Sequence, residues 1–220
     1  LRAVYNRAVE KGLTSQRFPF KHVYTGVEKT VKRAVPLKVI KRIKEMDFSM
    51  NPTFDFARDM FLMSFYTRGM SFVDMAYLRK KDLQNGVLSY RRRKTGQLLF
   101  IKWEKCMQEI VNKYDTSQSN YLLPIIKPFG DIDERKQYIY AAHNINRCLK
   151  IIGKELGLSV SLTLYVARHA WASIAKSKNV PLSVISEGMG HDSEATTRIY
   201  LASLDTMAID KANSMILKSL

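Results

Sequence analysis

One short segment of the chain alternates between apolar and polar residues, and this segment restricts the fold more than any other feature. It contains residues 87–92 (VLSYRR) and 97–103 (QLLFIKW), which flank a turn sequence, KTG, at 94–96. The pair NG at 85–86, just before them, is a strong signal for a tight turn between antiparallel strands. The sequence therefore predicts one small three-stranded antiparallel sheet.

Helical periodicity dominates on both sides of this segment. Leu37, Ile40 and Ile43 recur at helical spacing after Pro36, which is typical of a helix with one buried face. Asn51 precedes a proline, the usual start of a further helix. Other helices are expected after Ser71 to near Leu78, over 104–114, over 136–156, from Thr163 to Asn179, from Pro181 to Gly188, after Ser193, and over 205–219. The predicted fold class is mainly α with a small three-stranded antiparallel β-sheet.

Three parts can be distinguished along the chain. Residues 1–12 have the pattern of a helix that ends at Gly12, residues 13–35 lack sustained periodicity and indicate a linker, and residues 36–220 form the main domain. The first residues lack the pattern of a signal peptide, and we expect the chain to be part of a longer protein. The sequence contains no run of about 18 apolar residues, the length that a membrane span requires. A cytoplasmic location is therefore the default expectation.

The chain is strongly basic, with 36 Lys and Arg against 20 Asp and Glu and a formal net charge of +16. Residues 1–110 hold 23 of the basic and 10 of the acidic residues. Four consecutive cations, residues 91–94 (RRRK), repel one another and indicate that a polyanion binds there. Alternate residues of a strand face opposite ways, so the four cannot all contact one phosphate. Nucleic acid is the first candidate partner, and an acidic membrane surface is the second.

Two segments of the C-terminal half carry candidate site residues. In TLYVARHAWASIA (163–175), Arg168 and His169 lie in the middle of an apolar helix, where a guanidinium is costly unless it meets an anion. In EGMGHDSEATTRIYL (187–201), His191 follows a Met-Gly turn, and Tyr200 comes nine residues later. An arginine suits a phosphate because its planar fork donates two parallel hydrogen bonds.

The order and spacing of these motifs resemble those of the tyrosine recombinases, also called phage integrases. The matching residues are Arg168-His169, Gly190-His191, Tyr200 and, in the hairpin turn, Lys94. FYTRGMSFVDMAYL (65–78) resembles the first conserved box of that family. The resemblance covers roughly residues 36–220, which implies a catalytic domain, and it fits residues 1–12 to the end of a preceding DNA-binding (core-binding) domain.

The resemblance implies a site-specific recombinase or integrase that cleaves and rejoins DNA strands through a 3′-phosphotyrosyl intermediate, without metal, ATP or another cofactor. Tyr200 would be the nucleophile, Arg168 the phosphate clamp and Lys94 the general acid. His191 would bind a phosphate oxygen or take the phenolic proton. The implied partners are double-stranded DNA, further copies of the chain in a tetramer on DNA, and accessory DNA-bending proteins in a bacterial host.

Two positions depart from the pattern of the family. Most members have an arginine where this chain has Ser71, and a histidine where it has Tyr165. Both departures are similar to those in integrases of conjugative transposons and related mobile elements. We expect Arg68, or failing that one of the three arginines at 91–93, to supply the second guanidinium. The expected DNA contacts are Tyr165, Ser71, Arg91, Arg92 and Arg93.

Three alternatives stay open at this point. Within the recombinases, the nearest alternative is an enzyme that resolves chromosome dimers. A DNA-binding regulator that kept the fold and lost catalysis would also explain Ser71 and Tyr165. A basic RNA-binding module is disfavoured because Tyr90 and Phe100 alone make a thin stacking surface on the sheet.

His169 is expected to point away from Arg168 and to anchor its helix.

Overall fold

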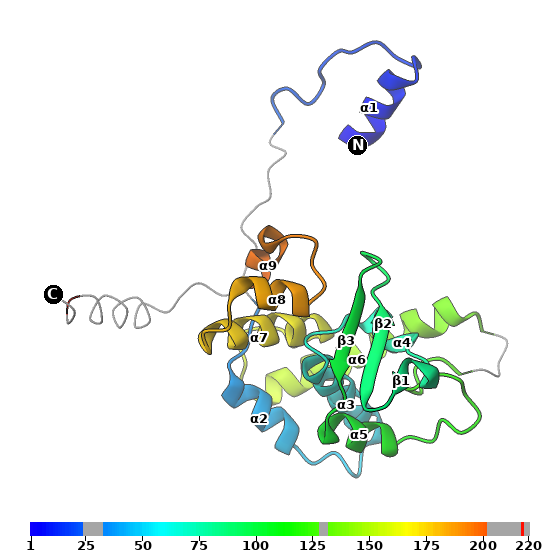
Figure 1. Cartoon of the computed structure of the whole chain (residues 1–220), viewed down its shortest axis with the longest axis vertical. Helices are drawn as coiled ribbons and strands as arrows, with labels where there is room; N and C mark the ends of the chain where they lie inside the picture. The colour runs from blue at the N-terminus through cyan, green and yellow to red at the C-terminus, as the bar shows by residue number, and fades with distance from the viewer. Residues whose placement is uncertain (24–32, 128–131, 202–216, 218–220) are drawn as a thin grey trace. The chain divides into compact units, whose positions relative to one another are not determined.

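The structure, a computed structural model, describes residues 1–23, 33–127, 132–201 and 217 (Figure 1). The chain divides into two compact units, Leu1–Val31 and Lys32–Leu220. In the first unit, α1 spans Arg2–Glu10 and Gly12 follows it with a φ of 68°, as the sequence predicts. Val35, the last residue of the predicted linker, is buried in the hydrophobic core of the second unit.

The second unit is mainly helical, and its helices begin and end close to the predicted positions. They are α2 (Leu37–Glu45), α3 (Pro52–Tyr66), α4 (Phe72–Ala76), α5 (Lys105–Asn112), α6 (Glu134–Glu155), α7 (Leu164–Ser177), α8 (Leu182–Gly188) and α9 (Glu194–Tyr200). A short 3-10 helix over Lys80–Asp82 is an addition that the sequence pattern did not predict. Almost all of the helix expected at 205–219 lies outside the described residues. None of the described helices is long and apolar enough to cross a membrane.

The predicted sheet is present and consists of β1 (Leu83–Gln84), β2 (Val87–Arg91) and β3 (Leu98–Lys102) in the order β1-β2-β3. Both strand pairs are antiparallel. The turn at 85–86 has positive φ at both residues, 50° and 73°, as a two-residue hairpin requires. Pairing of β2 with β3 places the buried residues of the two strands on one face of the sheet, namely Leu88, Tyr90, Leu99 and Ile101.

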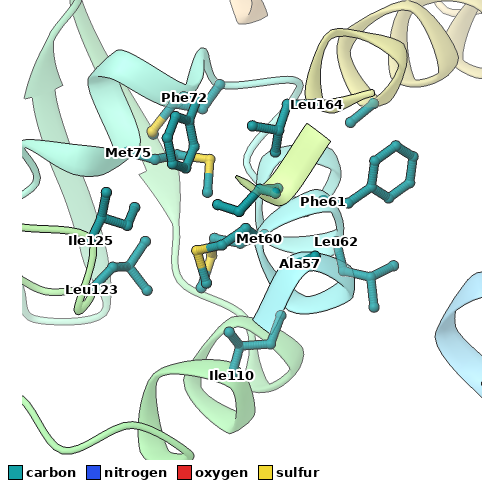
Figure 2. Packing of buried hydrophobic residues seen from close by; sticks show 14 of the residues in the cluster. Ala57, Met60, Phe61, Leu62, Phe72, Met75, Ile110, Leu123, Ile125 and Leu164 are labelled. Carbon is teal, nitrogen blue, oxygen red and sulfur yellow. The ribbon is translucent and has the colours of Figure 1, made fainter. Parts of the chain in front are cut away.

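The hydrophobic core forms around α3, which packs against α5, α6 and α7. Met60 on this helix is fully buried in a cluster with Met75 of α4, Ile110 of α5 and Leu123 (Figure 2). The local start of α3 follows from its sequence, since Asn51 accepts a hydrogen bond from the Phe54 amide at 3.4 Å. This core fixes α7 in place, and α7 carries the central arginine of the candidate site.

Candidate active site

A pocket of about 300 Å³ lies where the β2–β3 turn meets α4, α6, α7 and α9. Three cationic side chains line it, Arg92, Lys94 and Arg168. Three tyrosines line it as well, namely Tyr138, Tyr165 and Tyr200. The other lining residues are Met70, Ser71, Phe72, Ala142, Asn146 and Leu164. None of these lining residues is an Asp or Glu, so the charge of the pocket favours an anion.

Arg168 is held from two sides inside this pocket. It is 4% exposed, and its Nη1 donates a hydrogen bond to the Gly69 carbonyl at 2.5 Å. Its Nη2 donates to the Met189 carbonyl at 2.7 Å and to Nε2 of His191 at 2.8 Å. A Cβ at Gly69, whose φ is 74°, would lie 2.7 Å from the Arg168 Cα. Glycine at this position therefore lets the loop after α3 approach α7 closely enough to anchor the guanidinium.

A second guanidinium, that of Arg92, is also buried at the pocket. Arg92 directly follows β2, is 5% exposed, and donates from Nη1 to the Gly190 carbonyl. The Nε atoms of Arg92 and Arg168 are both buried without a hydrogen-bond partner. Among the ion pairs of the described residues, none joins either arginine to a carboxylate. Burial, followed by repulsion from Arg92, lowers the pKa of Arg168. The two positive charges thus lack a counter-charge from this part of the chain.

His191 is held as a neutral ring. It is 6% exposed, and burial together with the charges of Arg168, Arg92 and Lys94 lowers its pKa from 6.5 to about 3. A guanidinium can only donate, so His191 Nε2 accepts from Arg168. His191 Nδ1 must then carry the proton and donate to Thr197 Oγ1 at 2.7 Å. The His191 ring therefore acts as a hydrogen-bond acceptor, and in this way it orients the guanidinium of Arg168.

Tyr200 is the last residue of α9 and is anchored through its backbone. Its carbonyl accepts hydrogen bonds from Nδ1 of His169 at 3.1 Å and from the Ser173 hydroxyl at 3.4 Å. Its ring is 8% exposed and stacks on His191 with the ring centroids 5.0 Å apart. The Arg168 guanidinium carbon lies 5.4 Å from the centre of the same ring. His169 was predicted to anchor its helix, and its hydrogen bond ties α7 to the candidate nucleophile.

Tyr165 lies beside Tyr200 at the start of α7. Their ring centroids are 5.6 Å apart, and Tyr165 is 47% exposed. Burial, followed by its interaction with Tyr200, raises the pKa of the Tyr165 phenol well above its usual value. Tyr165 therefore stays protonated at neutral pH and is able to donate a hydrogen bond.

Lys94 lies in the β2–β3 turn, exposed and at the edge of the pocket. The turn is held by the buried Asp74, whose Oδ1 accepts a hydrogen bond from the Arg93 amide at 2.9 Å. Asp74 Oδ2 accepts from the Ser71 hydroxyl at 2.5 Å. Ser71 lines the pocket and at the same time acts on the turn through Asp74.

The other predicted basic residues lie around the pocket rather than in its lining. Arg91 is exposed and donates from Nη1 to the Gly96 carbonyl at 2.5 Å. Arg93 is exposed as well, with its guanidinium carbon 4.0 Å from the centre of the Tyr77 ring. Arg68 is partly buried and has a φ of 61°, and its Cδ lies near Gly188, outside the set of described residues that line the pocket.

Sequence reasoning missed two residues of the site. Thr197 is fully buried and accepts the hydrogen bond from Nδ1 of His191, and Asp74 holds the turn that carries Lys94. An acidic residue inside the apolar segment FVDMA was a signal for Asp74. Thr197 offered none, since a threonine on a short helix is ordinary. Within the described residues, no cluster of three His, Cys, Asp or Glu could hold a metal ion.

Comparison with known proteins gives matches at two levels. The model of the phage integrase family matches residues 37–207, while no curated protein sequence matches the chain significantly. Among solved structures, XerA recombinase has a TM-score of 0.58 at 17% identity, covering 97% of this chain and 73% of its own. The Tn1549 transposon integrase in complex with circular intermediate DNA has 0.59 at 16%, covering 97% and 75%.

A lambda integrase dimer bound to a COC′ core site has a TM-score of 0.61 at 14% identity. The match covers 90% of this chain and 55% of the lambda integrase chain, so that protein is much longer. At these identities the similarity shows the fold, which is the tyrosine recombinase catalytic fold with its helices and three-stranded sheet. Because the family model covers most of the sequence, the chain belongs to the phage integrase family of tyrosine recombinases.

Proposed function

We propose that this chain is the catalytic domain of a DNA integrase that cleaves and rejoins DNA strands through a 3′-phosphotyrosyl intermediate. The pocket supports this most directly, since the phenol of Tyr200 shares it with two buried guanidiniums that have no carboxylate partner among the described residues. A phosphodiester supplies the missing negative charge, and its two non-bridging oxygens match the fork of an arginine.

In the proposed cleavage step, the Tyr200 oxygen attacks the phosphorus and the bond from phosphorus to the 5′-oxygen breaks. The phenolic proton passes to water, and Lys94 gives a proton to the leaving 5′-oxygen. Arg168 stabilises the charge that develops on the non-bridging oxygens, and one preorganised donor of this kind contributes about 3 kcal/mol. His191 keeps Arg168 oriented by accepting its hydrogen bond.

Rejoining reverses these steps. A 5′-hydroxyl attacks the phosphotyrosyl link, the bond to Tyr200 breaks, and the phenol recovers its proton. The energy of the original phosphodiester is retained in the tyrosyl ester throughout, so the cycle needs no ATP. The neutral Tyr165 beside Tyr200 is proposed to donate a hydrogen bond to the bound phosphate.

Double-stranded DNA is the proposed substrate, with Arg91 and Arg93 contacting its backbone beside the pocket. Lambda integrase, a structural neighbour, has been solved as a tetramer bound to a Holliday junction. We extend that assembly to this chain, so that four copies act on two duplexes with accessory DNA-bending proteins.

The proposal is tested with nicked duplexes whose sequence is randomised around the nick, because the nick lets the cleaved end diffuse away and traps the adduct. We expect the wild-type chain to form a protein–DNA band that survives denaturation. Tyr200→Phe should abolish this band while DNA binding and melting temperature stay unchanged, because only the phenolic oxygen is lost. An adduct that persists in Tyr200→Phe excludes Tyr200 as the nucleophile. DNA binding without any adduct in the wild type supports a non-catalytic regulator instead.

A further inference from the structure

The site proposed above has a gap on one side of the phosphate. Ser71 lines the pocket at the position where most family members have an arginine, and a hydroxyl supplies neither the charge nor the fork. We infer that Arg92 fills this gap and is a catalytic residue, the second guanidinium that binds the scissile phosphate. The inference rests on the proposed function and assigns the clamp to the strand side of the pocket.

The alternation of the strand turns Arg92 toward the pocket, whereas its neighbours Arg91 and Arg93 face outward. Leu88 and Tyr90 of β2 are buried on the inner face of the sheet, and Arg92 continues their alternation at 5% exposure. Arg91 and Arg93 fall on the other phase of the alternation and are exposed. The run of cations thus divides into one inward guanidinium and two outward ones.

One turn anchors both buried arginines. Arg168 donates to the carbonyl of Met189, and Arg92 donates to the carbonyl of Gly190, the next residue. His191, which accepts from Arg168, follows directly. Gly190 has a φ of 65°, and a Cβ there would lie 3.1 Å from the Arg92 Cδ. The turn therefore holds both guanidiniums, which come from separate elements, at the same pocket before any ligand arrives.

This arrangement is costly without an anion. Both arginines leave a buried Nε donor without a partner, and each such donor costs stability. The charge of Arg92 also lowers the pKa of Arg168 and of His191. A phosphate between the two guanidiniums would accept from the open donors and offset the repulsion, which is the expected sign of a preorganised anion site.

Arg68 is the alternative candidate for the second guanidinium, and its position does not favour that role. Its Cδ lies near Gly188 on the α8 side, and it is absent from the described lining of the pocket.

The test measures the rate of covalent adduct formation on the randomised nicked duplexes. Arg92→Ala should form the adduct on the order of 10²-fold more slowly than wild type. Lys102→Ala is the matched control, because it removes an exposed positive charge from the same hairpin outside the pocket, and its rate should equal the wild-type rate.

A second substrate separates catalysis from folding, since Arg92 also anchors Gly190. Replacing one non-bridging oxygen of the scissile phosphate by methyl makes the phosphate neutral and removes the need for one cation. On this methylphosphonate, Arg92→Ala and wild type should react within about 3-fold of each other, a difference of less than 1 kcal/mol. A purely structural defect would persist on both substrates and would overturn the inference.

The double variant Ser71→Arg/Arg92→Met adds an independent check. It returns the guanidinium to the position used by most of the family, and it should recover at least part of the rate that Arg92→Met loses. Equal rates for wild type and Arg92→Ala on the ordinary phosphate refute the inference and leave the proposed function standing. Absence of any wild-type adduct refutes both.

Discussion

The two tyrosines to which the proposal gives different roles, Tyr200 and Tyr165, are anchored differently in the pocket. Tyr200 is anchored by two hydrogen bonds to its backbone carbonyl, and its ring contacts the rings of His191 and Tyr165. Tyr165 is half exposed and has a pKa raised by burial. A nucleophile must hold its oxygen in a defined place, whereas a donor needs mainly a proton. These contacts support the proposed roles, in which Tyr200 attacks the phosphorus and Tyr165 donates a hydrogen bond.

The lowered pKa of His191 predicts a pH dependence of stability. The unfolded chain binds a proton at this residue below about pH 6.5, while the folded chain does so only near pH 3. Between these values the unfolded state holds the extra proton, so stability is full above pH 6.5 and falls as the pH drops. Wild type should lose more melting temperature between pH 7.5 and 4.5 than His191→Gln, whose amide can both donate to Thr197 and accept from Arg168 without titrating.

Equal losses in the two proteins would contradict a neutral, buried His191. The comparison isolates this residue, because the carboxylates and the other histidines titrate in both proteins.

At the scale of elements, the close approach of the α3–α4 loop to α7 predicts the effect of one methyl group. Gly69→Ala would add a Cβ 2.7 Å from the Arg168 Cα at a backbone φ of 74°. Strain at this φ costs about 1 kcal/mol or more, and the clash must also displace α7. We expect a clear drop in melting temperature and a loss of adduct formation.

Gly157→Ala is the matched control for this prediction. Gly157 follows α6 with a φ of 68°, and an added Cβ there meets no atom within 4 Å. It should carry the backbone strain alone, about 1 kcal/mol, and leave adduct formation per folded molecule unchanged. Similar losses in both variants would show that the contact of Gly69 with α7 does not matter.

Across these elements, the sequence predicts what is decided locally. The start of α3 at Asn51 and the hairpin turn at 85–86 depend on neighbouring residues, and both are confirmed. Burial of Arg92 depends on a hydrogen bond to Gly190, a residue 98 positions away, and the tautomer of His191 depends on contacts with two helices. Strand alternation separates Arg92 from Arg91 and Arg93. No local pattern encodes the long-range contacts, however, so the sequence alone does not show which face of the run meets the pocket.

At the scale of the whole molecule, the net charge of +16 predicts how DNA binding responds to salt. Each phosphate that a cation neutralises releases a counterion, and six to ten such contacts lower affinity roughly 10³- to 10⁵-fold between 50 and 200 mM salt. Arg91 and Arg93 point outward beside the pocket, and removing each should reduce the slope of log affinity against log salt by about 1. Tyr200→Phe changes no charge and should keep the wild-type slope. Fluorescence anisotropy on a labelled duplex of random sequence measures all four proteins, and a wild-type affinity independent of salt would contradict DNA as the partner.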